Sequence, residues 1–394
     1  MRLDFLRPLE ERPGPYASVY VTTERDAEDA ACAVALRWRA TRDQLSAAGA
    51  DEATLDAVED VVTDPGRAAP GRAVFASGGQ VAYTEGLPTP PIRERATWSP
   101  LPEAAPLLAQ RAELLPHVRV LIDRKGADIT DVGPRRERRQ REDPGHGPVQ
   151  RVKEGGWSQE HYQRSAMEAW KQNAKEVADT VAEAAAAVGA EMIIIGGDVR
   201  ARGLLFDSLG EREKARAVIA EHGGARTGGT DEQAWAQETR RLIAERRAAR
   251  HGRELAEFRE GHGRGDAVDG LGDVAAALRA GQARVVLIAR GTADAGPDSS
   301  PDTDQAASPQ AGSEAGPAGA DGVSGHLWYG PEPTQLAATQ EELRDLGIPE
   351  PRRERASSVL IRAAAGTQAE VDVIDPGELA LADGAGALLR FTTA

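Results

Sequence analysis

One feature constrains the fold of this chain more than any other: a proline-free run of helical periodicity lies between two apolar, strand-like segments. From Gln159 to Gly189, small and apolar residues recur at helical spacing, and Gly189 suits the C-terminal stop. The strand-like segments are Val118–Ile122 and Met192–Gly197, and the turn Asp123-Arg124-Lys125-Gly126 after the first one predicts a hairpin that continues to Val132. Strands that alternate with a long helix in this way predict an α/β domain whose sheet is mixed or parallel.

A glycine pair precedes the predicted helix. Gly155 and Gly156 lack the Cβ atoms that restrict φ, so their backbone can take conformations that other residues avoid. Ser158, two residues later, suits the N-cap position of the helix. The pattern predicts a mobile loop that stands on a rigid helix and can enter a narrow cavity. A purely connective surface loop is the equal alternative.

The segment that leads to the glycine pair is rich in positive charge, although the formal net charge of the chain is −15. Its basic residues are Arg135, Arg136, Arg138, Arg139, Arg141, Arg151 and Lys153. Only Glu137, Glu142 and Asp143 oppose them. A local positive excess on an acidic chain predicts a polyanionic partner, such as a phosphate backbone, that is met at this basic loop and repelled elsewhere.

The N-terminal part alternates strands and helices. We expect a strand at Ala17–Thr23, helices at 27–48 and 51–62, and a hairpin in which 72–76 and 81–84 flank Gly78-Gly79-Gln80. The prolines from Pro88 onward predict irregular chain as far as Leu115.

The C-terminal part repeats this mixture. A charged helix at 233–257 leads to a short helix at 270–281 and a buried strand at 283–289. Residues 291–325 have no apolar periodicity, which predicts a disordered insertion within one domain. A helix at Pro333–Leu346 and strands at Ser357–Arg362 and Ala387–Thr392 are expected after it.

The composition argues against several classes of protein. Charged residues make up 28% and apolar ones 40%, and no run approaches the roughly 18 apolar residues of a membrane span, so a cytoplasmic protein without membrane contact is expected. The single cysteine, Cys32, excludes a disulfide framework and a cysteine-based zinc site. The histidines form no His-Glu-x-x-His pair, and Gly196-Gly197 is interpreted as a tight turn, so no metal or cofactor is expected.

Taken together, these motifs resemble those of the bacterial relatives of the archaeal and eukaryotic peptide-chain release factors. That group includes Pelota-like proteins and the Vms1/ANKZF1-like peptidyl-tRNA hydrolases, and within it the chain is most similar to actinobacterial relatives of the ribosome hibernation factor Balon. The resemblance runs from Val118 to Ile288 and implies a mixed α/β and α+β fold of three domains. These are an N-terminal α/β domain (1–116), a middle domain with the Gly-Gly loop (117–255) and an L30e-like C-terminal domain (256–394).

In release factors the loop tip is Gly-Gly-Gln, and the glutamine positions water against the ester of peptidyl-tRNA. The resemblance assigns this tip to Gly155 and Gly156, with Gln159 as the nearest candidate for the catalytic glutamine. Trp157 and Ser158 intervene, and water placement tolerates errors of about 1 Å poorly, so hydrolysis is in question. Trp157 is expected either to stack on an unpaired base or to pack on the helix.

The resemblance leaves two principal functions open. One is a ribosome-binding factor of the hibernation and stress type, which occupies the A site and the peptidyl-transferase centre. The alternative is a peptidyl-tRNA hydrolase that rescues stalled ribosomes, and a nucleotide-binding stress protein is a third. The implied partners of a monomeric chain are ribosomal RNA, P-site tRNA and elongation factor Tu. Gly78-Gly79-Gln80 lacks a basic lead-in and a following helix, so it is interpreted as a turn.

Overall fold

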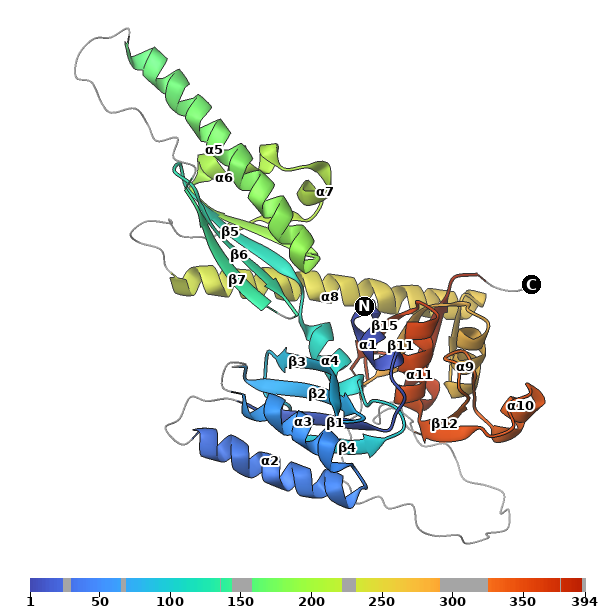
Figure 1. Cartoon of the computed structure of the whole chain (residues 1–394). Helices are drawn as coiled ribbons and strands as arrows, with labels where there is room; N and C mark the ends of the chain where they lie inside the picture. Colours follow the sequence, from blue (N-terminus) through green and yellow to red (C-terminus); the bar gives the residue numbers. More distant parts are fainter. Residues whose placement is uncertain are drawn as a thin grey trace. The chain divides into compact units, whose positions relative to one another are not determined.

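The computed structural model describes residues 1–23, 30–64, 69–134, 136–143, 158–221, 232–290, 325–375 and 377–391; within these ranges the side chains of 30–32, 136 and 158–166 are not described. The chain divides into two compact units (Figure 1). Unit 1 is formed by Met1–Ala112 and Arg253–Ala394, and unit 2 by Glu113–Gly252. The mixed α/β and α+β fold is confirmed. The division into three domains stays a prediction.

Unit 2 is built on a five-stranded sheet of order β7-β6-β5-β8-β9. Its strands are β5 (His117–Ile122), β6 (Ala127–Gly133), β7 (Arg136–Glu142), β8 (Met192–Gly197) and β9 (Ala217–Ile219). β5, β6 and β7 form an antiparallel meander, whereas β5, β8 and β9 are parallel. The predicted hairpin and the predicted buried strand therefore both exist, and they lie side by side.

Helices cover both faces of this sheet. They are α5 (Ser158–Val188), α6 (Val199–Ser208), α7 (Glu211–Lys214) and α8 (Glu232–Arg264). On one face Val177 and Val181 of α5 share a core with Ile193 and Ile195. On the other face the alternate residues of β8, Met192 and Ile194, share a core with Trp235 and Leu242 of α8. Burial on both faces explains why β8 is a continuous apolar run.

Two glycines set the position of α5. The helix ends where predicted, because Gly189 takes a left-handed φ of 63°. Gly133 at the end of β6 has no side chain where Val188 approaches it, since a Cβ there would lie 3.0 Å from the valine Cβ. The carboxyl end of α5 therefore lies at the Gly133 end of β6, and its amino end points toward the turn between β5 and β6.

The interpretation of Gly196-Gly197 as a tight turn is wrong, because both glycines belong to β8. A Cβ on Gly197 would lie 2.0 Å from the carbonyl oxygen of Ile122, and a Cβ on Gly196 would lie 2.6 Å from the ring of Trp235. The pair therefore permits close packing at the end of the strand.

Part of the predicted basic loop is also wrong, because Arg136–Glu142 forms the edge strand β7. Seven consecutive polar residues resemble a loop in sequence. They form a strand here because β6 offers them a complete antiparallel register, from Gly133 opposite Arg136 to Ala127 opposite Glu142. An edge strand with charged side chains is a common way of protecting a sheet from further pairing.

The N-terminal part of unit 1 contains a four-stranded antiparallel sheet of order β3-β2-β1-β4. Its elements are α1 (Arg7–Glu10), β1 (Tyr16–Thr22), α2 (Ala30–Ala47), α3 (Glu52–Thr63), β2 (Gly71–Ser77), β3 (Gln80–Leu87), β4 (Arg95–Ser99) and α4 (Ala105–Glu113). The predicted strand, helices and hairpin are confirmed, and Asp51 caps α3 by accepting from the Thr54 amide. The irregular chain expected before Leu115 is wrong, because it includes β4 and α4. Pro106 lies in the first turn of α4, where a missing amide costs nothing.

The C-terminal part of unit 1 contains two sheets, of orders β10-β16-β11-β15 and β13-β12-β14. Its elements after α8 are β10 (Ala267–Asp269), α9 (Leu271–Arg279), β11 (Ala283–Ala289), β12 (His326–Tyr329), β13 (Leu336–Ala337), α10 (Gln340–Asp345), β14 (Arg352–Arg355), α11 (Ala356–Gly366), β15 (Glu370–Ile374) and β16 (Ala385–Leu389). The predicted helix at 270–281 and the strand at 283–289 are found, and the strand expected at 387–392 lies earlier, at Ala385–Leu389. Residues 291–324 lie outside the described residues.

Two predictions in this part are wrong. The strand expected at Ser357–Arg362 is the helix α11, most of whose residues are buried, and the spacing of a short apolar run does not distinguish a buried strand from a buried helix. The helix expected at Pro333–Leu346 is shorter, because it begins only after Thr339, whose hydroxyl accepts from the Glu342 amide.

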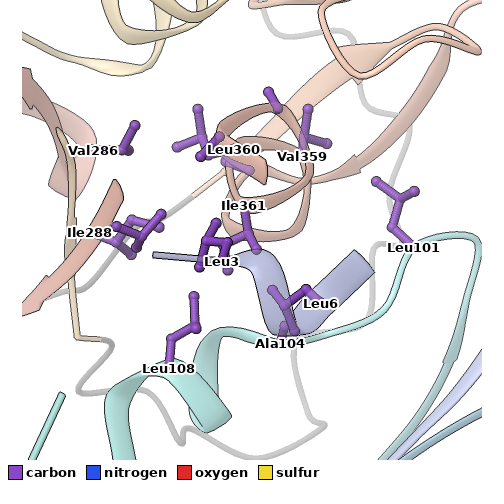
Figure 2. Packing of buried hydrophobic residues seen from close by; sticks show 14 of the residues in the cluster. Leu3, Leu6, Leu101, Ala104, Leu108, Val286, Ile288, Val359, Leu360 and Ile361 are labelled. Carbon is purple, nitrogen blue, oxygen red and sulfur yellow. The ribbon is translucent and has the colours of Figure 1, made fainter. Parts of the chain in front are cut away.

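Unit 1 has a core that joins residues from both ends of the chain. Figure 2 shows Leu3 and Leu6 among Leu101 and Leu108 from the N-terminal part and Ile361 from α11. The backbones of Met1 and Val371 exchange two hydrogen bonds, of 2.6 and 2.9 Å. The side chain of Glu103, only 6% exposed, accepts from Arg355 at 3.0 Å and from Arg95 at 2.7 Å. Apolar and charged contacts thus both hold β14 and α11 against the N-terminal part.

Candidate nucleic-acid interface

The structure brings three of the predicted basic residues together on one edge strand. Arg138, Arg139 and Arg141 are exposed on β7, and we call them the β7 edge. The backbone of Arg136 lies on the same strand, and Ser158 and Gln159 are the first two residues of α5. The remaining predicted site residues, Arg135, Arg151, Lys153, Gly155, Gly156 and Trp157, lie outside the described residues.

The arginines of the β7 edge differ in their partners. Arg139 is 80% exposed and pairs with Glu137 at 3.3 Å, and Glu137 also accepts from Arg119 at 2.9 Å. Arg141 pairs with Asp143 at 2.9 Å. Arg138 makes no ion pair within the described part of the chain. Exposed ion pairs of this kind contribute about 0–1 kcal/mol to the stability of the fold. A phosphate can therefore displace these carboxylates at little cost in free energy.

The end of β7 is set by a glycine in the turn between β5 and β6. A Cβ on Gly126 would lie 1.9 Å from the carbonyl oxygen of Glu142 and 2.9 Å from the Asp143 carboxylate. The turn itself is closed by Asp123, whose carboxylate accepts from the amides of Lys125 and Gly126 at 2.7 and 3.0 Å. The strand β7, which carries the exposed arginines, therefore ends at the same end of the sheet as β5 and β8, where β6 begins.

The amino-terminal part of α5 projects beyond this same end of the sheet (Figure 1). Asn173 and Ala174 are buried, whereas Met167, Glu168, Lys171 and Gln172 are exposed. The 12 residues from Ser158 to Ala169 precede Trp170, and at 1.5 Å per residue they reach roughly 18 Å. The described chain on either side of the glycine pair thus consists of an arginine-bearing strand and a projecting helix.

A cluster that sequence reasoning missed braces the base of this projection. The guanidinium of Arg124 lies 4.8 Å from the ring centroid of Trp170, and its Nε lies 3.5 Å from a carboxylate oxygen of Asp198. The side-chain amide of Asn173 donates to the Arg124 carbonyl at 3.1 Å. Asp198 also caps α6, since it accepts from the amides of Arg200 and Ala201. In the sequence, the turn Asp123-Arg124-Lys125-Gly126 was the signal that pointed to Arg124.

Burial perturbs one titratable group of unit 2. The pKa of His117 is lowered by burial, and the Arg119 charge lowers it further, although its Nδ1 lies 2.7 Å from the Leu115 carbonyl oxygen. His117 begins β5 at the Gly133 end of the sheet, opposite Val132. It is therefore a structural histidine, two strands away from Glu137 of β7 in the register of the sheet.

The second glycine pair of the chain forms a turn, as predicted. Gly78 and Gly79 take left-handed φ values of 57° and 74° between β2 and β3. The Gly79 amide donates to the Thr54 hydroxyl, and Arg12 donates to the side-chain oxygen of Gln80, both at 2.8 Å. The glutamine of this turn is thus held within unit 1.

None of the described helices is both long enough and apolar enough to cross a membrane.

Comparisons with known proteins match both the middle of the chain and its whole length. Residues 116–264 match the model of bacterial archaeo-eukaryotic release factor family 2. The chain is 30% identical over 399 residues to the "Uncharacterized protein Rv2629" of Mycobacterium tuberculosis (strain ATCC 25618 / H37Rv), over 99% of this chain and 97% of that protein. The values are the same for "Uncharacterized protein MT2704" of strain CDC 1551 / Oshkosh.

Solved structures of translation factors are also similar to this chain. The archaeal translation termination factor aRF1 is 15% identical, with a TM-score of 0.26 over 98% of this chain and 96% of that one. A model of ribosome-bound archaeal Pelota with ABCE1 is 14% identical, with a TM-score of 0.39 over 99% of this chain and 94% of that one. Both TM-scores are low, so neither likeness carries a conclusion about this chain. The chain therefore belongs to one family with its full-length mycobacterial relatives, and its residues 116–264 are similar to bacterial archaeo-eukaryotic release factor family 2.

Proposed function

We propose that this protein is a ribosome-binding translation factor of the release-factor type, which occupies the A site and presents the end of unit 2 to the peptidyl-transferase centre. The observation that carries the proposal is that the arginines of β7 run along the edge of the sheet toward the end from which α5 projects, with Arg141 nearest to that end. We propose further that it blocks resting ribosomes, as a hibernation factor does, and does not release peptides.

The β7 edge suits the phosphate backbone of ribosomal RNA. Guanidinium groups bind phosphate oxygens through paired donors, and a strand spaces alternate side chains by about 7 Å along one face. Arg139 and Arg141 are two residues apart and therefore lie on the same face, while Arg138 lies on the opposite face. With arginines on both of its faces, β7 is suited to enter a groove and to contact RNA on either side.

The projecting helix supplies reach and stiffness. A helix with roughly 18 Å beyond its last support can carry its first residues into a cavity that the sheet is too wide to enter. The cluster of Arg124, Trp170 and Asp198 holds the helix at the point where it leaves the sheet. Rigid support of this kind lowers the entropy that would be lost on binding.

The place of Gln159 favours blocking over hydrolysis. In release factors the catalytic glutamine follows the glycine pair directly, whereas here Trp157 and Ser158 lie between. Gln159 is the second residue of α5, so its backbone is fixed in the first helical turn. A glutamine that is displaced by two residues and held in a helix is poorly suited to position water within about 1 Å.

Sedimentation of the full chain with 70S ribosomes tests the proposal. Vacant ribosomes and ribosomes that carry peptidyl-tRNA are used, and both co-sedimentation and peptide release are scored. A blocking factor co-sediments with vacant ribosomes and releases no peptide. An arm with added elongation factor Tu tests the partner that the resemblance implies.

Two other outcomes would overturn parts of the proposal. Peptide release that is lost in Gln159→Ala, with co-sedimentation unchanged, would make the protein a peptidyl-tRNA hydrolase. Absence of co-sedimentation with either kind of ribosome would contradict ribosome binding itself.

A further inference from the structure

A second arginine-rich edge strand lies in unit 1. The sequence Pro-Arg-Arg-Glu-Arg of Pro134–Arg138, at the start of β7, recurs as Pro351–Arg355. The second copy forms β14, which is an edge strand of the sheet β13-β12-β14. Residues of the same five-residue sequence thus lie on a sheet edge in each unit.

The register of β14 determines which of its side chains face outward. His326 is opposite Arg355 and Trp328 is opposite Arg353, so these four side chains share one face of the two strands. The alternate residues of β12, Leu327 and Tyr329, are buried in the core of unit 1. The face with the two arginines is therefore turned away from that core, and Trp328 on it packs in part against Ala337, Leu343 and Ile348; we call it the β14 face.

This face carries net positive charge. Arg353 is exposed and makes no ion pair or hydrogen bond within the described residues. Arg355 is 55% exposed and shares the carboxylate of Glu103 with Arg95, so one negative charge faces two guanidinium groups. Burial lowers the pKa of His326, and the charges of Arg353 and Arg355 lower it further, although Glu354 opposes them. The histidine is thus neutral near pH 7 and accepts a proton more readily once an anion lies nearby.

We propose that the β14 face, formed by His326, Trp328, Arg353 and Arg355, is a contact surface for single-stranded RNA. Arg353 and the outward edge of Arg355 bind phosphates, and a base stacks on the exposed part of the Trp328 ring or on the Arg353 guanidinium. This inference goes beyond the proposed function, because it assigns RNA binding to unit 1 and does not depend on the β7 edge.

The chemistry of the face favours RNA over an acidic protein. An acidic protein needs only the guanidinium charges, whereas a nucleic-acid strand also stacks its bases on a neighbouring aromatic ring. Trp328 is directly opposite Arg353, where Cβ atoms of paired residues are about 4.5–5.5 Å apart. A chain with a net charge of −15 repels RNA over most of its surface, so this face would fix the orientation of the strand.

Fluorescence anisotropy with a labelled single-stranded RNA of about 16 nucleotides tests the inference on the full-length chain, over a range of potassium chloride concentrations. The logarithm of the affinity falls as the logarithm of the salt concentration rises. Each lost phosphate contact makes this fall less steep, by about 0.7 in the slope for a single strand. We expect this decrease for Arg353→Gln, and we expect Arg353→Lys to keep the slope. Arg39→Gln, on α2 of the same unit, removes an equally exposed charge and is the matched control with an unchanged slope.

The same measurement in an Arg138→Gln, Arg139→Gln, Arg141→Gln background separates the two surfaces. Residual binding that Arg353→Gln lowers further supports the inference, even if sedimentation fails to show ribosome binding. Cross-links from a 4-thiouridine RNA to His326–Tyr329 would support it independently. Equal slopes for Arg353→Gln and Arg39→Gln would overturn it. It would also be overturned if Arg353→Gln weakened ribosome binding while RNA affinity stayed unchanged, because the partner would then be a protein.

Discussion

The edge strands β7 and β14 both contain part of the same five-residue sequence, yet their charged side chains have different partners. In β7 the glutamate of the repeat, Glu137, is 47% exposed and accepts from Arg119 and Arg139. In β14 the corresponding Glu354 accepts from the backbone amide of Arg355 at 2.9 Å. The last arginine also differs, since Arg138 has no ion pair in the described part of β7 and its neighbours, whereas Arg355 pairs with the buried Glu103.

The difference shows that the surroundings of a charged repeat determine what it does. A carboxylate that is 6% exposed, such as Glu103, holds two arginines and joins β14 to the N-terminal part of unit 1. The exposed carboxylates around β7 hold their arginines weakly. By this account β14 is both an anchor and a binding face, while β7 is free to serve as a binding edge alone.

The largest expected effect is on stability, at the anchor of β14. Glu103→Ala removes the shared partner of Arg95 and Arg355 and should lower the free energy of unfolding by about 3 kcal/mol, because it leaves desolvated charges unpaired. Glu137→Ala, which removes the shared partner of Arg119 and Arg139 beside β7, should cost less than about 1 kcal/mol. Urea denaturation of both variants measures the two values. Similar losses for both would remove the distinction between anchored and free edges.

The next effect concerns the end of β7. Gly126→Ala places a methyl group against the Glu142 carbonyl oxygen, and we expect a loss of about 2 kcal/mol in the free energy of unfolding. Gly203→Ala is the matched control, since a Cβ there has no neighbour within 4 Å, and it should stabilise α6 slightly. Denaturant titration measures both, and an unchanged Gly126→Ala would show that β7 can shift without cost.

Neutralising the β7 edge should change binding and leave stability unchanged. Arg138→Gln, Arg139→Gln, Arg141→Gln should lower the salt slope of single-stranded RNA affinity by roughly 2, at about 0.7 for each lost phosphate contact. The control is Arg212→Gln on α7, which removes an exposed charge from the same unit. If the RNA affinity of this triple variant no longer depended on salt, the β14 face would contribute nothing to RNA binding.

The smallest effect is a dependence of stability on pH. Burial lowers the pKa values of His117 on β5 and His326 on β12 below their ordinary value of 6.5. The folded chain therefore binds fewer protons than the unfolded chain just below that value, so stability is complete above about pH 6.5 and falls as the pH decreases. His117→Gln should flatten this fall more than His326→Gln, because His117 is buried and His326 is exposed. Melting temperatures at about pH 7 and about pH 5.5 measure the difference, and equal flattening would contradict it.

Periodicity predicted the parts of the fold that are amphipathic or capped. The long helix α5, the hairpin of β5 and β6 and the strand β8 were all predicted, because their apolar spacing or their terminal glycines are visible in the sequence. Periodicity failed to predict elements whose structure is determined by burial or by strand pairing and not by their own apolar spacing. The apolar run of α11 is short and buried and so resembles a buried strand in sequence, and β7 is a strand only because β6 pairs with it.

The candidate site was predicted in part. Composition identified the arginines of β7, since a local positive excess is visible in an acidic chain. It did not identify Trp170 and Asp198 as the partners of Arg124, because they lie 46 and 74 residues later in the sequence and meet it only in the fold. The repeat at β14 was visible in the sequence, but its outward face required the register of β12.

Directed hydroxyl-radical probing tests the central claim most directly. An iron chelate is attached at Met167→Cys, on the exposed part of α5, in a Cys32→Ser background, and the full chain is bound to 70S ribosomes. The proposed function predicts cleavage of 23S ribosomal RNA around the peptidyl-transferase centre, with weaker cleavage there from a control tether at Arg212→Cys on α7. Cleavage from Met167→Cys that is confined to other regions of the ribosome, or absent, would contradict it.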